Sequence, residues 1–156
     1  PSRGLGDVYK RQVGKCHMFK EVINQSMLSD CFEIRKSVFV EEQGVPLESE
    51  LDIFENTSTH IIGYYNDHPF ACARFRPYED GIKVERVAIL KPYRNKGFGK
   101  TLMNTIESIG KQKHHHKLIL NAQLQAKPFY EKLGYISIGL PFQEENIAHI
   151  KMYKII

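Results

Sequence analysis

The sequence has little of what marks secreted, membrane-spanning or metal-stabilised proteins. Its three cysteines, Cys16, Cys31 and Cys72, are odd in number and widely spaced, unlike a disulfide framework or a zinc site. No apolar run approaches the roughly 18 residues needed to cross a bilayer. No basic start followed by a short apolar run predicts a signal peptide. We therefore expect a cytoplasmic protein without a membrane partner, and expect Cys31 and Cys72 to be buried small apolar residues.

The chain also has only a small excess of charge of one sign. The net charge is +4, and half of it comes from residues 1–12, so the remainder is too small to predict nucleic-acid binding. The run His114-His115-His116 does not predict a metal site, because adjacent residues of a helix point to different sides. With Lys111 and Lys113 it is typical of a cationic helix end.

The first residues do not resemble part of a folded domain. The chain begins with Pro1, and residues 1–12 show no sustained apolar period. They resemble a translated cloning or adaptor segment, and Met18 would serve as a native start. We expect residues 1–17 to be a non-native or disordered extension and residues 18–156 to form a single domain.

The most informative segment is residues 94–100, Arg-Asn-Lys-Gly-Phe-Gly-Lys. It follows an apolar run, 84–90, and precedes an amphipathic run, 98–109, which predicts a strand, a glycine-rich turn and a helix. The first amides of a helix lack internal partners and lie at the positive end of its dipole. The turn is therefore suited to bind phosphate groups. The alternative is a basic capping turn with solvated charges.

Two nucleotide-binding motifs fail in this turn at a required glycine. A P-loop would need glycine at position 94, where the chain has Arg94. A dinucleotide-binding motif would need glycine at position 102, where the chain has Leu102. A nucleotide-binding protein is therefore the weakest hypothesis for this turn.

The turn instead has the form Arg-x-x-Gly-x-Gly after a strand, and residues 84–103 resemble the GNAT superfamily of acetyl-CoA-dependent N-acyltransferases. Residues 120–123, Leu-Asn-Ala-Gln, and 128–135, Pro-Phe-Tyr-Glu-Lys-Leu-Gly-Tyr, resemble the second half of that family. Residues 32–46 resemble the first helix of its small bacterial ElaA-like branch. The resemblance covers residue 18 to the C-terminus, and the order of the three blocks makes it specific.

The hydrophobic pattern predicts a mixed α/β fold. Strands are expected at about 18–23, 60–65, 70–76, 82–90, 117–121, 135–138 and 149–153, with helices at about 29–42, 98–109 and 126–133. Hairpins come early and crossovers late, which favours a mostly antiparallel central sheet flanked by helices. The resemblance implies the GNAT-type acyl-CoA N-acyltransferase fold, in which the fourth and fifth strands splay apart where acyl-CoA sits.

The same resemblance implies that the chain transfers the acetyl group of acetyl-CoA, the cosubstrate, directly to a primary amine of a small molecule or peptide. No metal is expected. The alternative is a CoA-binding regulatory module without turnover. Residues 42–57 and 141–148 are expected to be the loops that select the acceptor. Their acidic residues hint at a cationic acceptor (an amino sugar, a polyamine or an amino-acid amine) or are simply solvated. A monomer and a homodimer are both compatible with the sequence.

The resemblance also assigns residues that bind the cosubstrate. Amides of the turn hold the pyrophosphate, amides of the preceding strand pair with the pantetheine arm and point at the acetyl carbonyl, and an asparagine after the next strand contacts the arm. The predicted set is Val87, Ala88, Ile89, Arg94, Asn95, Lys96, Gly97, Phe98, Gly99, Lys100 and Asn121.

Transfer to an amine requires a proton acceptor. A lysine-like amine has a pKa of about 10.4, so freeing it at pH 7 costs about 4.6 kcal/mol. Glu85, in the strand leading to the turn, is the first candidate, with pairing to Arg86 or Lys83 as the structural alternative. His149 is the second, because His-Ile-Lys-Met at 149–152 resembles the His-x-x-Met ending of the ElaA-like branch. A polar histidine packed near the sheet is its structural alternative.

Three further residues complete the predicted site. Tyr130 matches the family tyrosine that faces the CoA sulfur, and a phenol can donate a proton to a leaving thiolate. Core packing is the alternative for Tyr130. Glu42 and Gln43 end the first helix, where the family binds the acceptor, although a solvated helix end would have the same composition.

Overall fold

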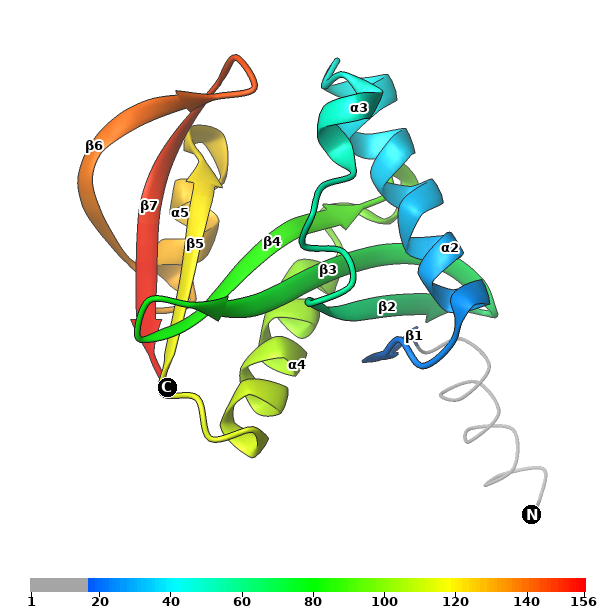
Figure 1. Ribbon diagram of the computed structural model, residues 1–156, viewed down its shortest axis with the longest axis horizontal. Coiled ribbons are helices and arrows are strands. Elements are labelled where there is room, and N and C mark those ends of the chain that lie inside the picture. Colours follow the sequence, from blue (N-terminus) through cyan, green and yellow to red (C-terminus); the bar gives the residue numbers. More distant parts are fainter. Residues whose placement is uncertain (1–16) are drawn as a thin grey trace.

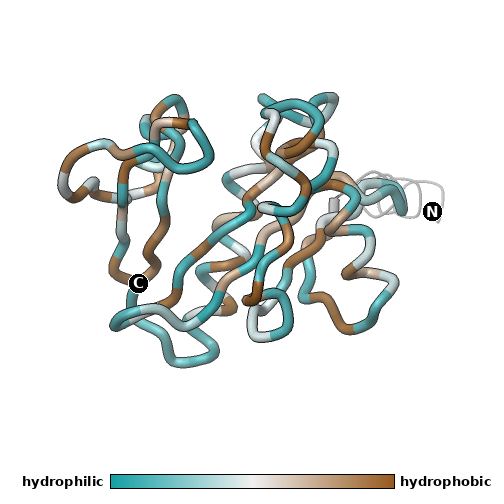
Figure 2. Tube along the Cα trace, turned by 45° about the horizontal axis from the view of Figure 1, so that its top comes forward, coloured by the Kyte–Doolittle hydropathy of each residue, from teal (hydrophilic) through white to brown (hydrophobic). Residues whose placement is uncertain are grey.

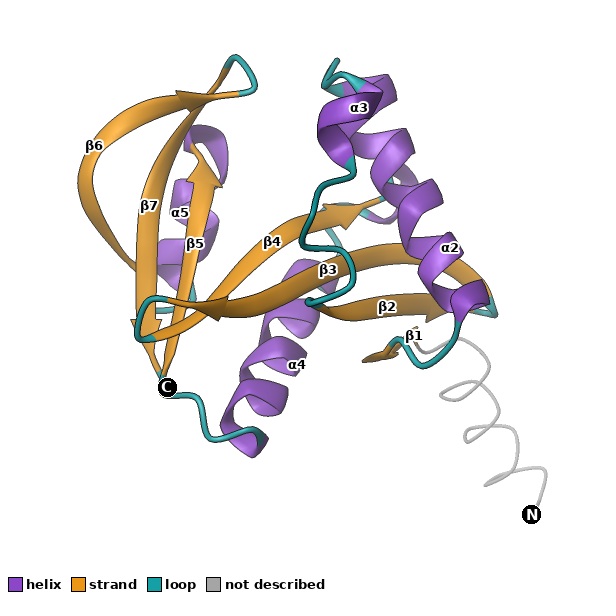
Figure 3. Ribbon diagram, in the orientation of Figure 1, coloured by secondary structure: helices purple, strands orange, loops and turns teal. Residues whose placement is uncertain are grey.

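The computed structural model describes residues 17–156, which form a seven-stranded sheet with helices on both faces (Figures 1 and 3). The strand order is β1-β2-β3-β4-β5-β7-β6, and every neighbouring pair is antiparallel except β4 and β5. The predicted mixed, mostly antiparallel sheet is confirmed. The segment predicted to be foreign or disordered lies outside the described residues, except for His17.

The first half of the sheet is an antiparallel meander. It contains β1 (His17–Glu21), β2 (Thr59–Tyr65), β3 (His68–Tyr78) and β4 (Gly81–Ile89). Between β1 and β2 the chain forms α2 (Gln25–Arg35), the π-helical segment η2 (Lys36–Glu42) and the short helix α3 (Leu47–Glu50). The first helix was predicted to begin at about residue 29, with Ser29 or Asp30 as its cap, but it begins four residues earlier, at Gln25. The cap is Asn24, whose side chain accepts a hydrogen bond of 2.9 Å from the Met27 amide.

The second half contains the crossovers. It consists of the short helix η3 (Lys91–Tyr93), α4 (Phe98–Gln112), β5 (Lys117–Gln123), η4 (Leu124–Ala126), α5 (Lys127–Lys132), β6 (Ile136–Glu144) and β7 (Ile147–Ile155). The loop expected at 141–148 is instead a hairpin. Strand β6 continues past a register shift between Ile138 and Phe142, and the chain turns at Glu145 and Asn146, with φ of 50° and 60°.

The core lies on both faces of the sheet. On one face, α4 buries Leu102, Met103 and Ile106 against strand residues such as Ile61. On the other, α2 packs Cys31 and Ile34 against neighbours that include Ile62 and Cys72. Ile61 and Ile62 serve opposite faces because successive strand residues point to opposite sides. Cys31 and Cys72 are buried, as predicted.

The distribution of hydropathy along the chain agrees with this packing. Apolar segments follow the central strands, whereas polar residues dominate the turns (Figure 2). Among residues 17–156, no helix combines the length and hydrophobicity that a bilayer crossing requires.

The sheet splits between β4 and β5. These two strands pair only at Ile82–Leu118, Lys83–Ile119 and Val84–Leu120. Beyond these pairs β4 stays with β3 up to Ile89, and β5 stays with β7 up to Gln123, so the two halves diverge (Figure 1). A register shift in the β3–β4 ladder, with Arg86 at φ 57°, marks a bulge at the start of the divergence. The splay that the family resemblance implies is therefore present.

Candidate active site

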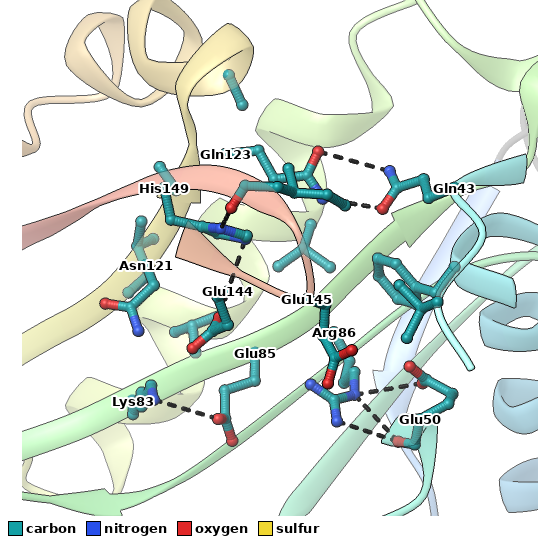
Figure 4. A pocket seen from close by; sticks show the side chains of 18 of the residues that line it. Gln43, Glu50, Lys83, Glu85, Arg86, Asn121, Gln123, Glu144, Glu145 and His149 are labelled. Carbon is teal, nitrogen blue, oxygen red and sulfur yellow. Dashed lines mark hydrogen bonds and ion pairs between the residues drawn. The ribbon is translucent and has the colours of Figure 1, made fainter. Parts of the chain in front are cut away.

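A cavity of about 480 Å³ occupies the split (Figure 4). That volume is within the usual range for small-molecule sites, about 300–1,000 Å³. Residues from every surrounding element line it: β4 supplies 84–87, β5 supplies 120–123, and α5 supplies Tyr130. The end of η2 contributes Gln43, and the β6–β7 hairpin contributes Glu144, Glu145 and His149. The cavity therefore joins the two halves of the sheet.

The edge of β4 that faces the split supplies free backbone groups. Residues 85–89 form no ladder with β5, because the parallel pairing ends at Val84. Val87 lines the cavity, whereas Ala88 is buried under α2. Asn121 lies across the split on β5, where its side chain points into the cavity (Figure 4). The predicted positions 87–89 and 121 thus lie on the two sides of one opening.

The glycine-rich turn begins α4. Gly97 is the N-cap at φ 86° and has no side-chain capping bond. The amides of Lys96, Gly97, Gly99 and Lys100 donate to no other group within residues 17–156. A Cβ on Gly97 would meet nothing within 4 Å, whereas one on Gly99 would lie 3.1 Å from the Phe129 ring. These open amides at a helix N-terminus fit a phosphate ligand.

Arg94 has partners that the sequence did not reveal. Its Nη1 and Nη2 donate to the Glu42 carboxylate at 2.9 and 2.7 Å, and its Nε donates to the Ile89 carbonyl at 2.8 Å. The Arg94 hydrogen bonds lower the pKa of Glu42. By contrast, the side chains of Lys96 and Lys100 form no ion pair with the described part of the chain. These two lysines, more than Arg94, are free to meet a phosphate.

Gln43 connects to the opposite side of the split. Gln123 Nε2 donates to Gln43 Oε1 at 2.9 Å, and the reciprocal contact is 3.5 Å (Figure 4). Because Glu42 is bonded to Arg94, two consecutive residues at the end of η2 reach the β4 side and the β5 side. The structure therefore places Glu42 and Gln43, predicted to bind the acceptor, as a bridge across the opening.

Glu85 lies at the cavity wall in a cluster of cations. Its carboxylate is 2.8 Å from Arg76 Nε, 3.0 Å from Arg74 Nη2 and 3.4 Å from Lys83 Nζ. Burial opposes ionisation of Glu85, but the Arg76 hydrogen bond and the neighbouring charges outweigh it, so the pKa of Glu85 is lowered. A carboxylate held in this way accepts protons poorly. Arg86, the other partner considered for Glu85, instead pairs with Glu50 at 3.2 Å.

Behind this wall lies a buried ion network that sequence reasoning missed. Arg35 and Arg74 are only 1% and 0% exposed. Arg35 binds the carboxylates of Glu50 and Glu55, and Arg74 binds those of Asp52, Glu55 and Glu85. The network fastens the segment after α3 to the sheet. One sequence signal was available, namely two arginines, at 74 and 76, on one face of a strand that otherwise reads as apolar.

Tyr130 faces the cavity from α5. It is 7% exposed, and its hydroxyl makes no hydrogen bond to the residues that the structure describes. Burial raises the pKa of Tyr130, so the phenol stays protonated at neutral pH. Its ring packs edge-on against Phe129 and Tyr135. The residue is therefore a core aromatic whose side chain also lines the cavity.

His149 lies across the cavity on β7 and is 7% exposed. Its Nδ1 is 2.6 Å from the Ile147 carbonyl oxygen. Because a carbonyl only accepts, Nδ1 must carry a proton, which leaves the Nε2 lone pair of the neutral ring available. The nearest carboxylate to Nε2 is Glu144, at 3.9 Å (Figure 4). The imidazole ring stacks on Phe142.

Comparison with known proteins agrees with this geometry. The family model described as an acetyltransferase (GNAT) domain matches residues 16–156. A Bacillus subtilis (strain 168) protein whose name describes an acetyltransferase is 40% identical over 138 residues, covering 86% of this chain and 94% of its own length. The crystal structure of Escherichia coli ElaA superimposes with a TM-score of 0.79 at 26% identity, covering 88% of this chain and 99% of ElaA.

A solved structure with a ligand shares the fold. It is a GNAT family acetyltransferase from Elizabethkingia anophelis with acetyl-CoA bound, which matches with a TM-score of 0.69 and covers 90% of this chain and 98% of its own. At 13% identity this is a likeness of fold alone.

Proposed function

Because the chain belongs to the GNAT acetyltransferase family, we propose that it transfers the acetyl group of acetyl-CoA directly to a primary amine of a small molecule or peptide. One observation carries the proposal. The cavity in the split brings together the unpaired edge of β4, the unbonded hydroxyl of Tyr130 and the available nitrogen of His149. These are the groups that acyl transfer to nitrogen needs, and they come from three different elements.

The phosphates would be held at the N-terminus of α4. The free amides at 96, 97, 99 and 100 bind them, with the ammonium groups of Lys96 and Lys100 close by. The pantetheine arm would run along the open edge of β4 towards Asn121. When bound, acetyl-CoA supplies the activated thioester carbonyl that accepts the amine. Every second amide of β4 faces the split, so those within 87–89 can stabilise negative charge on the carbonyl oxygen.

Of the two predicted proton acceptors, we favour His149. Glu85 is held ionised by Arg76, Arg74 and Lys83, which lowers its pKa and its affinity for a proton. His149 donates its Nδ1 proton to the Ile147 carbonyl, so Nε2 of the neutral ring is free to accept a proton. On the opposite side of the cavity, Tyr130 can donate its proton to the departing sulfur.

The proposal is tested by two measurements on the same protein. Calorimetry with coenzyme A tests the phosphate-binding turn, and release of free thiol from acetyl-CoA with a panel of primary amines tests turnover. We expect calorimetry to give a dissociation constant for coenzyme A in the micromolar range. We also expect at least one amine class to release thiol faster than acetyl-CoA is hydrolysed without an amine. Coenzyme A binding without turnover of any amine would instead support a regulatory module. No heat on folded protein would end both readings.

A further inference from the structure

We propose that Glu144 forms an acceptor-binding pair with His149, and that the acceptor is a cationic amine without a carboxylate beside the reacting nitrogen. This inference rests on the proposed N-acetyl transfer and specifies its substrate class. Glu144 lies in the stretch 141–148, which was expected to be an acceptor-selecting loop, but the sequence assigned it no role of its own because its acids could equally be solvated.

The β6–β7 hairpin builds the pair. Phe142 is the register partner of His149, and Glu144 is the partner of Ile147, whose carbonyl accepts the His149 Nδ1 proton. The same ladder thus fixes the backbone of both residues and the tautomer of the ring. It leaves Nε2 and the Glu144 carboxylate 3.9 Å apart at the cavity (Figure 4). That gap is too long for a hydrogen bond, so both groups keep capacity for a ligand.

The two walls of the cavity differ in how their charges are compensated. On the sheet side every lining carboxylate touches at least two cations. Glu50 contacts Arg35 and Arg86, Asp52 contacts Arg74 and Arg86, and Glu85 contacts Arg74, Arg76 and Lys83. On the hairpin side, Glu144 and Glu145 contact no lysine or arginine within residues 17–156. The uncompensated negative charge of the cavity therefore lies beside His149.

Two polar atoms of largely buried side chains open onto the cavity. The Tyr130 hydroxyl and the His149 Nε2 belong to side chains more than nine-tenths buried, and neither has a hydrogen-bond partner among the described residues. Because no fully buried side-chain polar atom of residues 17–156 lacks a partner, both atoms must reach the open space of the cavity, where a ligand can bond to them. An ammonium group between Glu144 and His149 would satisfy one of them.

The proton balance follows from this placement. The ammonium group R–NH₃⁺ gives one proton to His149 Nε2, and the freed nitrogen pair forms the new C–N bond while the C–S bond of the thioester breaks. A second proton leaves the nitrogen as the amide forms, the thiolate gains one proton, and His149 returns its proton to water. The net change is one amide, one thiol and one released proton. Glu144 stabilises the ammonium first and then the protonated imidazole.

The acceptor class follows from the same charges. A carboxylate on the carbon next to the reacting amine would lie close to Glu144 and Glu145, and like charges at that range repel. Matched compounds whose single aliphatic amine does or does not bear this carboxylate are tyramine and tyrosine, histamine and histidine, and ethanolamine and serine. In the wild type we expect kcat/KM to be at least about 10-fold higher for the decarboxylated member of each turned-over pair.

Glu144→Gln should lower kcat/KM for the decarboxylated amine, so that the ratio of kcat/KM between the decarboxylated and the carboxylate-bearing amine falls several-fold. The calorimetric affinity for coenzyme A should not change. Glu33→Gln removes the same charge from an exposed position on α2 and is the matched control. A wild-type preference for the carboxylate-bearing members, or an unaltered ratio in Glu144→Gln, would overturn the inference while leaving amine acetylation intact.

A second readout does not depend on turnover. The His149 imidazole can be titrated by NMR in the free protein. The charged groups that share its cavity are Glu144 and Glu145 and, across the split, the paired groups Glu50, Asp52, Arg76, Lys83, Glu85 and Arg86. In Glu144→Gln the midpoint should move to lower pH, because the carboxylate that favours the protonated ring is gone. An unmoved midpoint means that Glu144 is only a surface charge. This result decides the matter even if none of the matched amines is acetylated.

Discussion

Replacing Arg74 with methionine tests how much the buried ion network contributes to the stability of the fold. Arg74 is 0% exposed and lies 2.6 Å from Asp52, 2.9 Å from Glu55 and 3.0 Å from Glu85. Removing one member of such a network costs about 3–5 kcal/mol, because the remaining charges lose their compensation. The three carboxylates are 12–27% exposed, so water offsets part of the loss and we expect about 3 kcal/mol.

The loss of stability in Arg74→Met should also depend on pH, in a direction set by the pKa values of the carboxyl groups. Burial raises the pKa of Asp52, but hydrogen bonds from Arg74 and the charges of its neighbours outweigh burial, and the pKa of Asp52 is lowered. The pKa values of Glu55 and Glu85 are lowered for related reasons. Such groups stabilise the fold above their unfolded pKa of about 4, and this stabilisation is lost as pH falls through the folded pKa. In Arg74→Met the pKa values of these carboxyl groups are lowered less. The loss of unfolding free energy relative to the wild type is therefore largest at neutral pH and becomes smaller in acid.

The assay is urea unfolding at pH 7 and at about pH 3, below the unfolded carboxyl pKa, with a thermal melt at pH 7. A loss of 3 kcal/mol corresponds to a fall in Tm of about 6–12 °C for a domain of this size. Lys36→Met, which removes an exposed cation from η2, is the control and should change stability by less than about 0.5 kcal/mol. An Arg74→Met protein as stable as this control at pH 7, or one whose deficit grows in acid, would refute the reasoning.

Four further substitutions test the proposed roles. Tyr130→Phe should lower kcat about 100-fold or more while the heat of coenzyme A binding changes little, and unaltered turnover would remove Tyr130 as the acid. Gly99→Glu should abolish coenzyme A binding on folded protein, since a side chain there meets the Phe129 ring at 3.1 Å and brings negative charge to the phosphates. His149→Gln should lower kcat/KM by about 100-fold or more, whereas Glu85→Gln should act mainly on stability; the reverse result restores Glu85 as base.

The parts of the fold that follow from local patterns could be predicted from the sequence. The turn at 94–100 and the helix after it are encoded by two glycines and by apolar residues spaced along one helix face, of which Leu102 and Ile106 are fully buried. The strands of the first meander are encoded by short apolar runs between polar turns, such as Asn66-Asp67 with φ of 49° and 67°.

The hairpin that carries the acceptor-binding pair could not be predicted in the same way. Strand β6 contains Gly139 at φ 75° and Pro141, and its apolar residues Ile136, Ile138 and Leu140 are exposed. Glycine and proline indicate a break in a strand. The alternation of apolar and polar residues that marks a half-buried strand is also absent, because the apolar residues of β6 are exposed. What keeps β6 in the sheet is pairing with β7, which is a property of two segments and not of one.

The split between β4 and β5 is likewise a matter of register. Three residue pairs hold the strands together, and the bulge at Arg86 then turns β4 away. Nothing in the run 82–90 distinguishes a strand paired along its whole length from one paired at three positions. The family resemblance could imply the splay because it adds information from other chains.

The charge of the site shows most clearly why composition is a poor guide to function. Glu50, Asp52 and Glu55 resemble solvated loop acids in sequence, yet Arg35 and Arg74, which are 15 to 22 positions from the acids they bind, pair with them. The electrostatic field in the cavity is therefore set by the acidic residues without a lysine or arginine partner. These are Glu144 and Glu145, on the hairpin beside His149. A substrate preference can be inferred only after the pairs are known, because the same acidic residues, paired differently, would attract a different molecule.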